Sequence, residues 1–480
     1  MRKLKKYISM GLAACICVSM TACGGRTKTT TTEEPQTAVT YETMEKALLE
    51  RIPAEHKEHQ VVIDTQETTD AAGVMSDTTA DATGTQADSS TDAVADTTQD
   101  TSESDTEQKD KSLIETITFW YTDDQDISYL QAASESFEKR YGIHVDYILR
   151  NDPDILAAVN QANEAGEAPD AYMLSNDMIR KAQMAGLVEK NAMYDDQFWN
   201  EHYPAVSKNA LSSGVSVYGY PIYLDTFFML YDQDYAGEPL TIENVLEFSE
   251  NFVDEENTKE IFRWDISDPF YNFMFLGGYA SLLGATGEDT SQFDVTNQYV
   301  LDSMTYFQSI HDILSMDMEE SSYEKIKKKI RKNKLIYAIC KTDILPILEE
   351  TQNAYKLAKL PKLTDTLDSG SLSITYAACV NPYADSVSAA TLFSIYLSYE
   401  YSDQQFGLTR HVSARSDIAR ENENDQLIYE QYMASDTIPK ALEMGDFWTY
   451  SEVAFSNIWD GNDVATELQT LQDTVQGRLN

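Results

Sequence analysis

The chain has 480 residues and a formal net charge of −44 at pH 7, with 80 acidic against 36 basic residues. A nucleic-acid-binding protein needs a basic face for the phosphates, so this charge excludes that class. One hydrophobic core rarely serves a chain of this length, and we therefore expect two lobes in the folded part. The dense basic run from Lys325 to Lys334 has the spacing of a solvated helix face.

Residues 1–22 have the features of a secretory signal peptide. Four basic residues among positions 2–6 precede an apolar stretch that is too short for a transmembrane helix. The sequence Met20-Thr21-Ala22-Cys23, followed by two glycines, resembles a bacterial lipoprotein cleavage box. The resemblance implies that Cys23 is lipidated, with palmitate or similar acyl chains, and anchors the protein to the extracellular face of a cell membrane, of the Gram-positive type. The alternative is an ordinary secretory signal with Cys23 unmodified.

Residues 23–112 are expected to join this anchor to the folded part. From Thr65 to Glu107 the chain has no aromatic residue, no Pro, no Lys and no Arg, so it cannot bury enough apolar surface to fold. We expect a tether with an end-to-end distance of roughly 35 to 40 Å. Residues 41–52 have the spacing of a short amphipathic helix and residues 59–65 resemble a short strand, with no predicted function for either.

The folded part begins at about Ser112 and alternates strands with helices, which predicts an α/β fold. Strands at 115–121 and 144–149 flank a helix that begins near Ile127 and ends at Gly142, so we expect a βαβ unit with a parallel sheet. Further strands are predicted at 168–177, 335–340 and 372–380, and further helices at 153–166, 242–252, 271–283, 299–314, 425–433 and 447–479.

Two cysteines, Cys340 and Cys379, belong to the folded part, and both lie in apolar strand-like runs. A small buried hydrophobic role is the commoner one in such runs, so no disulfide is expected.

Ligands of open α/β sheets bind beyond the carboxyl ends of the strands. Carboxylates accept hydrogen bonds from ligand hydroxyls, and aromatic rings cover the C–H surfaces of a ligand. We therefore predict a site for a polar, uncharged ligand where polar strand ends meet aromatic faces. Its polar members are Thr122 to Gln125, Asn176, Asp177 and Asp225, and its aromatic members are Trp120, Tyr220, Tyr223 and Trp448.

Residues 115–480 resemble the extracellular solute-binding proteins of bacterial ABC transporters, of the maltose and oligosaccharide type. The resemblance rests on the segments FEKRYGIHV, APDAYMLSNDMIRKAQMAGLVE, GYPIYLDTFFMLYD and GDFWTYSEV, which begin at Phe137, Ala168, Gly219 and Gly445. It implies a two-lobed, periplasmic-binding-protein-like fold with three hinge crossings and a cleft between the lobes. The implied lobes are 113–225 with 379–422, and 226–378 with 423–480; the crossings fall within 217–231, near 372–379 and near 421–425.

The same resemblance implies individual ligand contacts. Asp124, Asp177 and Trp448 match sugar-binding positions, Asp225 stands in for a glutamate, and Asp268 and Phe270 replace a glutamate and a stacking tyrosine. Leu174 and the run Lys341 to Asp343 stand where two further aromatic platforms are expected, so a ligand other than maltodextrin is favoured. The full predicted set is Trp120, Asp124, Gln125, Asn176, Asp177, Tyr223, Asp225, Asp268, Phe270, Asp343 and Trp448.

The implied function is that of a membrane-anchored, monomeric binding component that closes on a saccharide or similar solute and delivers it to ABC permease subunits, without catalysis, metal or cofactor. Two alternatives remain. A secreted glycoside hydrolase needs a pair of carboxylates, which Asp124, Asp177 and Asp225 could supply. A surface lipoprotein could also use the same fold to sense a signal or to bind a protein.

Overall fold

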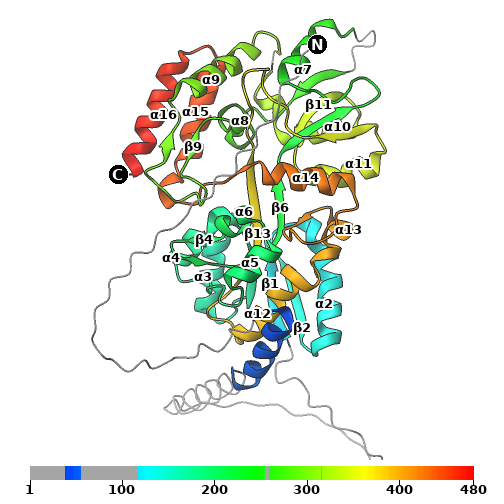
Figure 1. The fold of residues 1–480 in the computed structure, drawn as a ribbon, viewed down its shortest axis with the longest axis vertical. Helices are drawn as coiled ribbons and strands as arrows, with labels where there is room; N and C mark the ends of the chain where they lie inside the picture. Colours follow the sequence, from blue (N-terminus) through cyan, green and yellow to red (C-terminus); the bar gives the residue numbers. More distant parts are fainter. Residues whose placement is uncertain (1–37, 56–115, 254–258, 315, 480) are drawn as a thin grey trace, which may run out of the picture. The chain divides into compact units, whose positions relative to one another are not determined.

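The computed structural model describes residues 38–55, 116–253, 259–314 and 316–479. Within these residues two main β-sheets organise two lobes (Figure 1). The N-terminal lobe surrounds a seven-stranded sheet of order β14-β6-β13-β3-β1-β2, with β15 paired to β13, and the C-terminal lobe surrounds a four-stranded sheet of order β12-β7-β11-β8. The predictions for residues 1–37, 59–65 and 65–107 lie outside the described residues.

The strands are β1 (Thr116–Tyr121), β2 (His144–Leu149), β3 (Ala171–Ser175), β4 (Ser212–Ser213), β5 (Ser216–Val217), β6 (Tyr220–Thr226), β7 (Phe228–Asp232), β8 (Glu260–Arg263), β9 (Ser281–Leu282), β10 (Phe293–Asp294), β11 (Leu335–Cys340), β12 (Tyr355–Ala358), β13 (Leu372–Val380), β14 (Val412–Ser413) and β15 (Asp436–Thr437). The α-helices of the N-terminal lobe are α2 (Ile127–Tyr141), α3 (Ile155–Ala165), α4 (Ile179–Met184), α5 (Asp196–His202), α6 (Ala205–Ala210), α12 (Val387–Ile395) and α13 (Gln405–Thr409). The remaining α-helices after residue 116 are α7 (Ile242–Asn251), α8 (Pro269–Leu276), α9 (Gln298–Ile310), α10 (Tyr323–Arg331), α11 (Leu345–Thr351), α14 (Glu423–Met433), α15 (Phe447–Trp459) and α16 (Val464–Leu479).

The predicted βαβ unit is confirmed. Strands β1 and β2 pair in parallel from Thr116 opposite His144 to Tyr121 opposite Leu149, and α2 connects them. Gly142 ends α2 in a left-handed conformation, with φ of 72°, and its N–H donates to the carbonyl of Glu138. This conformation favours glycine because it carries no Cβ.

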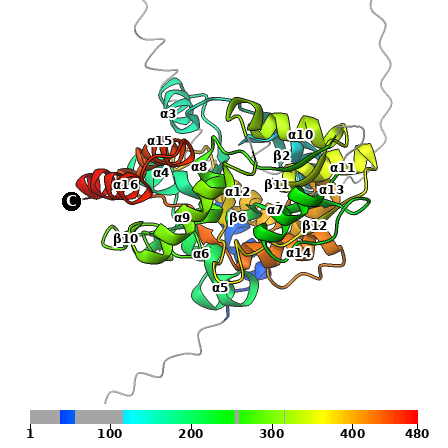
Figure 2. The same cartoon turned by 90° about the horizontal axis from the view of Figure 1, so that it is seen from above.

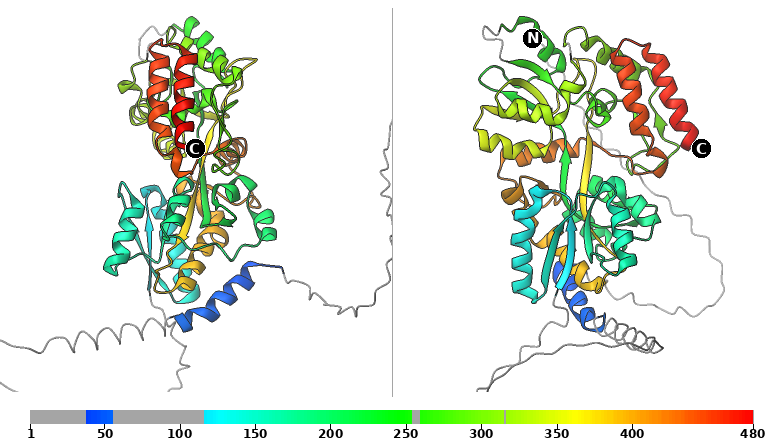
Figure 3. Two further views of the ribbon diagram at one scale, coloured as in Figure 1. Left: turned by 90° about the vertical axis from the view of Figure 1, so that its left-hand side faces the viewer. Right: turned by 180° about the vertical axis from the view of Figure 1, so that it is seen from behind.

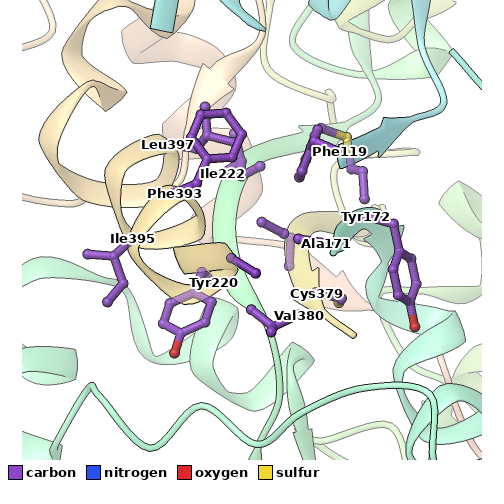
Figure 4. Close-up of a cluster of buried hydrophobic side chains, with 14 of the residues drawn as sticks. Phe119, Ala171, Tyr172, Tyr220, Ile222, Cys379, Val380, Phe393, Ile395 and Leu397 are labelled. Atoms are coloured by element: carbon purple, nitrogen blue, oxygen red, sulfur yellow. The ribbon is translucent and has the colours of Figure 1, made fainter. Parts of the chain in front are cut away.

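The N-terminal lobe is held by large side chains on both sides of β13 and β3 (Figure 4). Phe119 meets Phe393 edge to face at 5.6 Å between ring centroids, and Tyr172 donates to the carbonyl of Leu187. Every residue from Ser388 to Ile395 of α12 is buried, which is typical of a helix inside a core rather than on a surface.

The stretch 217–231 crosses from one sheet to the other at Phe227. Its first half, β6, pairs antiparallel with β13 of the larger sheet, and its second half, β7, pairs with β11 and β12 of the smaller one. The β6–β13 register shifts between Tyr376 and Ala377, opposite Pro221. Proline has no N–H to give to the ladder, so a local irregularity is expected there.

Two further connections join the lobes. The chain passes from β12 to β13, and after β14 it enters α14, which contacts both β6 and β12 (Figure 2). Helices α15 and α16 then pack side by side in the C-terminal lobe, separated by a turn at Gly461 with φ of 96° (Figure 3).

The predicted helix at 271–283 is wrong in its second half, since α8 ends at Leu276. A Cβ on Gly370, in the segment before β13, would lie 2.3 Å from the carbonyl carbon of Gly277, and a Cβ on Gly278 would lie 2.8 Å from the carbonyl oxygen of Asp368. The two backbone segments therefore approach so closely that a side chain at Gly278 or Gly370 would collide with the other segment.

The basic run forms α10, with Ile326 and Ile330 buried and Lys328 exposed, as predicted for a solvated face. Both cysteines are free and buried, Cys340 in a cluster of the C-terminal lobe and Cys379 in the N-terminal core. No helix within the described ranges is long and apolar enough to cross a membrane.

Candidate functional site

Three stacked rings lead from the N-terminal core to the crossing strand β13. His411 lies on Tyr223 at 4.1 Å between ring centroids, and Tyr223 lies on Tyr376 at 4.5 Å. His411 and Tyr223 are buried, whereas Tyr376 is half-buried. The predicted ligand residue Tyr223 therefore supports the ring of Tyr376, and Tyr376 is the one of these three residues that is partly exposed.

A buried carboxylate holds the inner end of this stack. Asp126, 1% exposed, lies 2.9 Å from Nδ1 of His411 and accepts a hydrogen bond of 3.3 Å from the hydroxyl of Tyr223. Burial lowers the pKa of His411, but the charge and hydrogen bond of Asp126 outweigh it, so the net shift is upward. Burial raises the pKa of Asp126, and the charge and hydrogen bond of His411 oppose this rise. The pair thus retains protons more tightly than the free groups do.

The loop after β1 places Asp123 beside this stack, with its carboxylate 3.8 Å from Nε2 of His411. Asp123 caps the short helix of residues 124–126 by accepting from the N–H of Gln125, and Asp124 is exposed. The predicted ligand residue Gln125 donates its side-chain amide to the carbonyl of Thr409 at 2.6 Å, so this amide fixes α13.

The end of β3 supplies Asn176 and Asp177. Asn176 is fully buried: its amide oxygen accepts from the N–H of Thr375 at 2.8 Å and its nitrogen donates to Thr437, so it fastens β13 and β15 to β3. Asp177 accepts from the hydroxyl of Ser175, and burial raises its pKa.

Asp225, on β6, connects the two sheets. It is 6% exposed and accepts from the N–H of Thr342 at 3.2 Å and from its Oγ1 at 2.9 Å, and Nζ of Lys341 lies 3.6 Å away. Both partners follow β11 of the smaller sheet. Burial raises the pKa of Asp225, which the lysine charge opposes. The carboxylate that the sequence marks as unusual for a strand therefore forms a polar link at the first crossing.

Lys341 lies among three predicted site carboxylates. Burial lowers the pKa of Lys341, but the charges of Asp225, Asp343 and Asp268 raise it by more. The net shift of the pKa is upward, and the lysine stays cationic. Asp343 accepts from the hydroxyl of Tyr323 at 2.5 Å and from a neighbouring lysine. Asp268 caps α8 by accepting from the N–H of Phe270, which is 8% exposed, and burial raises the pKa of Asp268.

The two predicted tryptophans lie in different lobes, Trp120 on β1 and Trp448 on α15. Trp120, 4% exposed, lines a cavity of about 240 Å³ with Arg150, whose guanidinium carbon lies 3.9 Å from the centroid of the indole ring. Trp448 is half-buried on α15, with Phe447 at 5.1 Å between centroids.

We call the residues around Tyr376 and Lys341 the junction site. Its carboxylates are Asp123, Asp126, Asp177, Asp225, Asp268 and Asp343, and Asp225 belongs to the surroundings of both Tyr376 and Lys341. The carboxylates can accept hydrogen bonds from hydroxyls and the ring of Tyr376 can cover C–H surface. The described part of the chain holds no group of three or more His, Cys, Asp or Glu side chains arranged for a metal ion.

Sequence reasoning missed Tyr376, Lys341 and His411 as members of the site. Each of two of them had a signal in the sequence. Tyr376 lies within the predicted crossing near 372–379, and Lys341 directly follows a predicted strand, where the rule of strand ends applies. For His411 the sequence carries no comparable signal, because its partners lie far away in the chain.

Two lobes joined by crossing strands, with polar and aromatic groups at their junction, define the class of two-lobed binding proteins. The chain belongs to the family of bacterial extracellular solute-binding proteins, which matches residues 132–423, and the expected family is thereby confirmed. Members of this family bind solutes and are not enzymes.

Relatives with curated names agree with this family. A maltotriose-binding protein of Pyrococcus abyssi is 27% identical over 138 residues, 28% of this chain and 30% of the relative. A maltooligosaccharide ABC transporter solute-binding lipoprotein of Streptococcus pneumoniae is 20% identical over 342 residues, 68% of this chain and 80% of the relative.

Among solved structures, the maltose-binding periplasmic protein MalE of Listeria monocytogenes in complex with maltose superposes with a TM-score of 0.67 at 17% identity, over 76% of this chain and 98% of that protein. The predicted two-lobed α/β fold is confirmed by this likeness.

Proposed function

We propose that the protein is the extracellular substrate-binding component of an ABC importer and binds a saccharide or a similar polar, uncharged solute by closure of its lobes. The observation that carries the proposal is the position of Tyr376. It lies on the crossing strand β13, and its ring is stacked on Tyr223. Four carboxylates lie near enough for their charges to raise the pKa of its hydroxyl: Asp123, Asp126, Asp177 and Asp225. The names of the relatives support a saccharide as ligand.

Closure is the mechanism we propose. A ligand that contacts both lobes favours the closed form by its difference in affinity between the two forms, whereas a ligand held by one lobe shifts nothing. Tyr376 and Asp177 belong to the N-terminal lobe, and Lys341, Asp343 and Asp268 to the other. A solute seated among them therefore has partners on both sides of β6 and β13.

The direct ligand contacts we propose are Asp124, Asp177, Asp268, Asp343, Trp448 and Tyr376. Asn176, Gln125, Tyr223 and Asp225 act in this proposal as supports, because their polar atoms or rings are held by protein partners. Lipidation at Cys23 and docking on a permease complete the proposal, and the name of the Streptococcus relative as a lipoprotein supports the first.

The test is calorimetry of the full chain carrying Cys23→Ser, titrated with mono- and oligosaccharides, together with mass spectrometry of small molecules released on denaturation. We expect one class of saccharide to bind, with compaction in small-angle scattering. Tyr376→Ala should weaken binding by about 3- to 10-fold, the value of a lost aromatic contact. Tyr383→Ala is the control, because Tyr383 is 65% exposed and no member of the site.

Two outcomes would overturn the proposal. If no saccharide gives heat and no small molecule is released, the fold serves another purpose, such as sensing or protein binding. If the purified chain hydrolyses a glycoside, the carboxylates act in catalysis.

A further inference from the structure

The helix of residues 41–55, which we call the N-terminal helix, has no part in the junction site. Four of its side chains are buried: Tyr41, Met44, Leu48 and Ile52, each at most 5% exposed, all packed in the N-terminal core. Their spacing of three or four residues places them on one face of the helix. Leu49, next to Leu48 but on another face, is 40% exposed.

Polar contacts fix the first turns of this helix to the lobe. The ring of Tyr41 stacks on Tyr399 at 5.8 Å, and its hydroxyl lies 2.8 Å from that of Tyr141. Tyr141 in turn donates to Glu45, and Arg140 pairs with the same carboxylate at 2.7 Å.

Glu55, the last residue of the helix that the structure describes, makes a second set of contacts. The carboxylate of Glu55 accepts from the hydroxyl of Ser386 at 2.7 Å, and from the N–H and hydroxyl of Ser388 at 3.0 and 2.5 Å. These donors lie at the start of α12, where the free N–H groups of a helix favour a negative charge. Apolar burial along the helix and polar contacts at its first turns and at Glu55 make residues 41–55 part of the N-terminal lobe (Figure 3).

This docking changes which segment separates the anchor from the lobes. Residue 55 and residue 116 both lie on the N-terminal lobe, so the 60 residues 56–115 begin and end on the same body. Between Cys23 and the N-terminal helix there are only 17 residues, 24–40, which span at most about 60 Å whatever their conformation.

We propose that the N-terminal helix is a clip that fastens the membrane anchor to the N-terminal lobe, so that residues 24–40 alone set the distance between lipid and binding site. The inference rests on the lipid anchorage of the proposed function. It replaces the expectation that the Thr- and Asp-rich segment 65–107 is the tether, since the residues before and after the stretch that contains it, 55 and 116, belong to the same lobe.

The test is site-specific cleavage of the full-length lipoprotein on membranes. One version carries a protease recognition site between Ser90 and Thr91, and another carries it between Thr30 and Thr31. We expect cleavage at Ser90 to leave the lobes with the membrane pellet, because the helix still holds them, and cleavage at Thr30 to release them. Release of the lobes after cleavage at Ser90 would overturn the inference.

Variants of the helix show whether docking is responsible. Leu48→Asp places a charge in the core and should increase the fraction released after cleavage at Ser90 on the order of tenfold or more, whereas the matched change Leu49→Asp should leave it unaltered. Glu55→Ala is a milder second variant, with an intermediate release, for the case that Leu48→Asp disturbs folding, which circular dichroism detects. If neither Leu48→Asp nor Glu55→Ala increases release, the clip is wrong.

Failure of the lipid anchorage has a different signature. In that case the uncleaved chain stays in the supernatant, and size-exclusion chromatography of the chain cleaved at Ser90 still tests the clip. Two fragments that elute together support the clip, and two that separate refute it.

Discussion

The polar link at the first crossing predicts a specific loss of stability in Lys341→Met. Asp225 is buried, and this substitution removes the lysine cation that lies 3.6 Å from it while the two hydrogen bonds from Thr342 remain. At 3.6 Å and an effective dielectric constant of about 20, the attraction between the two charges is about 4 to 5 kcal/mol before desolvation.

Net losses are smaller than this attraction. Removal of one partner from a fully buried ion pair costs about 3 to 5 kcal/mol, because the other charge stays buried and unpaired. The side chain of Lys341 is 24% exposed and the Thr342 bonds persist, so we expect a loss of about 2 to 3 kcal/mol in the free energy of unfolding. Asp225→Asn in the same background should recover part of this loss, since it removes the unpaired charge.

Urea denaturation followed by circular dichroism measures these differences as a double-mutant cycle. Lys356→Met is the matched control, because Lys356 is exposed on β12 of the same sheet, and we expect it to lie within about 0.5 kcal/mol of the parent. If Lys341→Met behaves like Lys356→Met, or if the cycle shows no coupling between Lys341 and Asp225, the link does not stabilise the crossing.

Two further predictions concern pH. The pKa of His411 is raised above its ordinary 6.5 through Asp126, so the native state binds this proton more tightly and stability should fall as pH rises above 6.5; urea denaturation over that range should show the fall, and His411→Gln should reduce it. The pKa of Lys440 is lowered to about 8, chiefly by burial, where its ammonium donates to the carbonyls of Asn209 and Ala210. The native state therefore releases this proton first, and stability should rise between about pH 8 and 10.5, by at most about 3 kcal/mol, in the parent but not in Lys440→Met. A flat profile for the parent in either range contradicts the corresponding prediction.

Elements with a local signal were predictable from the sequence. Strands β11 and β13 follow from their apolar runs, and the end of α2 follows from Gly142, because a neighbouring residue or a single pattern decides each. The end of α8 also carried a local signal, because Gly277 and Gly278 directly follow Leu276 and a Gly-Gly pair marks a turn. The close approach of Gly370, which lies 93 residues later in the chain, had no such signal.

The rule of strand ends selects positions rather than side-chain roles. Asp177 follows β3 and Asp225 lies near the end of β6, as the rule requires, and their part in ligand binding stays a prediction. Which ring of the pair Tyr223 and Tyr376 faces outward depends on His411, from a distant element that covers the other face of Tyr223. The N-terminal helix was likewise foreseen as a helix, while its role depends on partners such as Tyr399 on the lobe surface.

The place of β13 in the larger sheet bears on how the protein is made. This strand lies between β6 and β3, and its Tyr376 pairs with Ser175, about 200 residues earlier. A chain synthesised from its N-terminus therefore presents β1, β2, β3 and β6 long before the strand that unites them exists. Until then β3 and β6 each have an unpaired, largely apolar edge, which invites association with other chains. Folding of this lobe has to wait for almost the whole polypeptide, and a high contact order makes it slow.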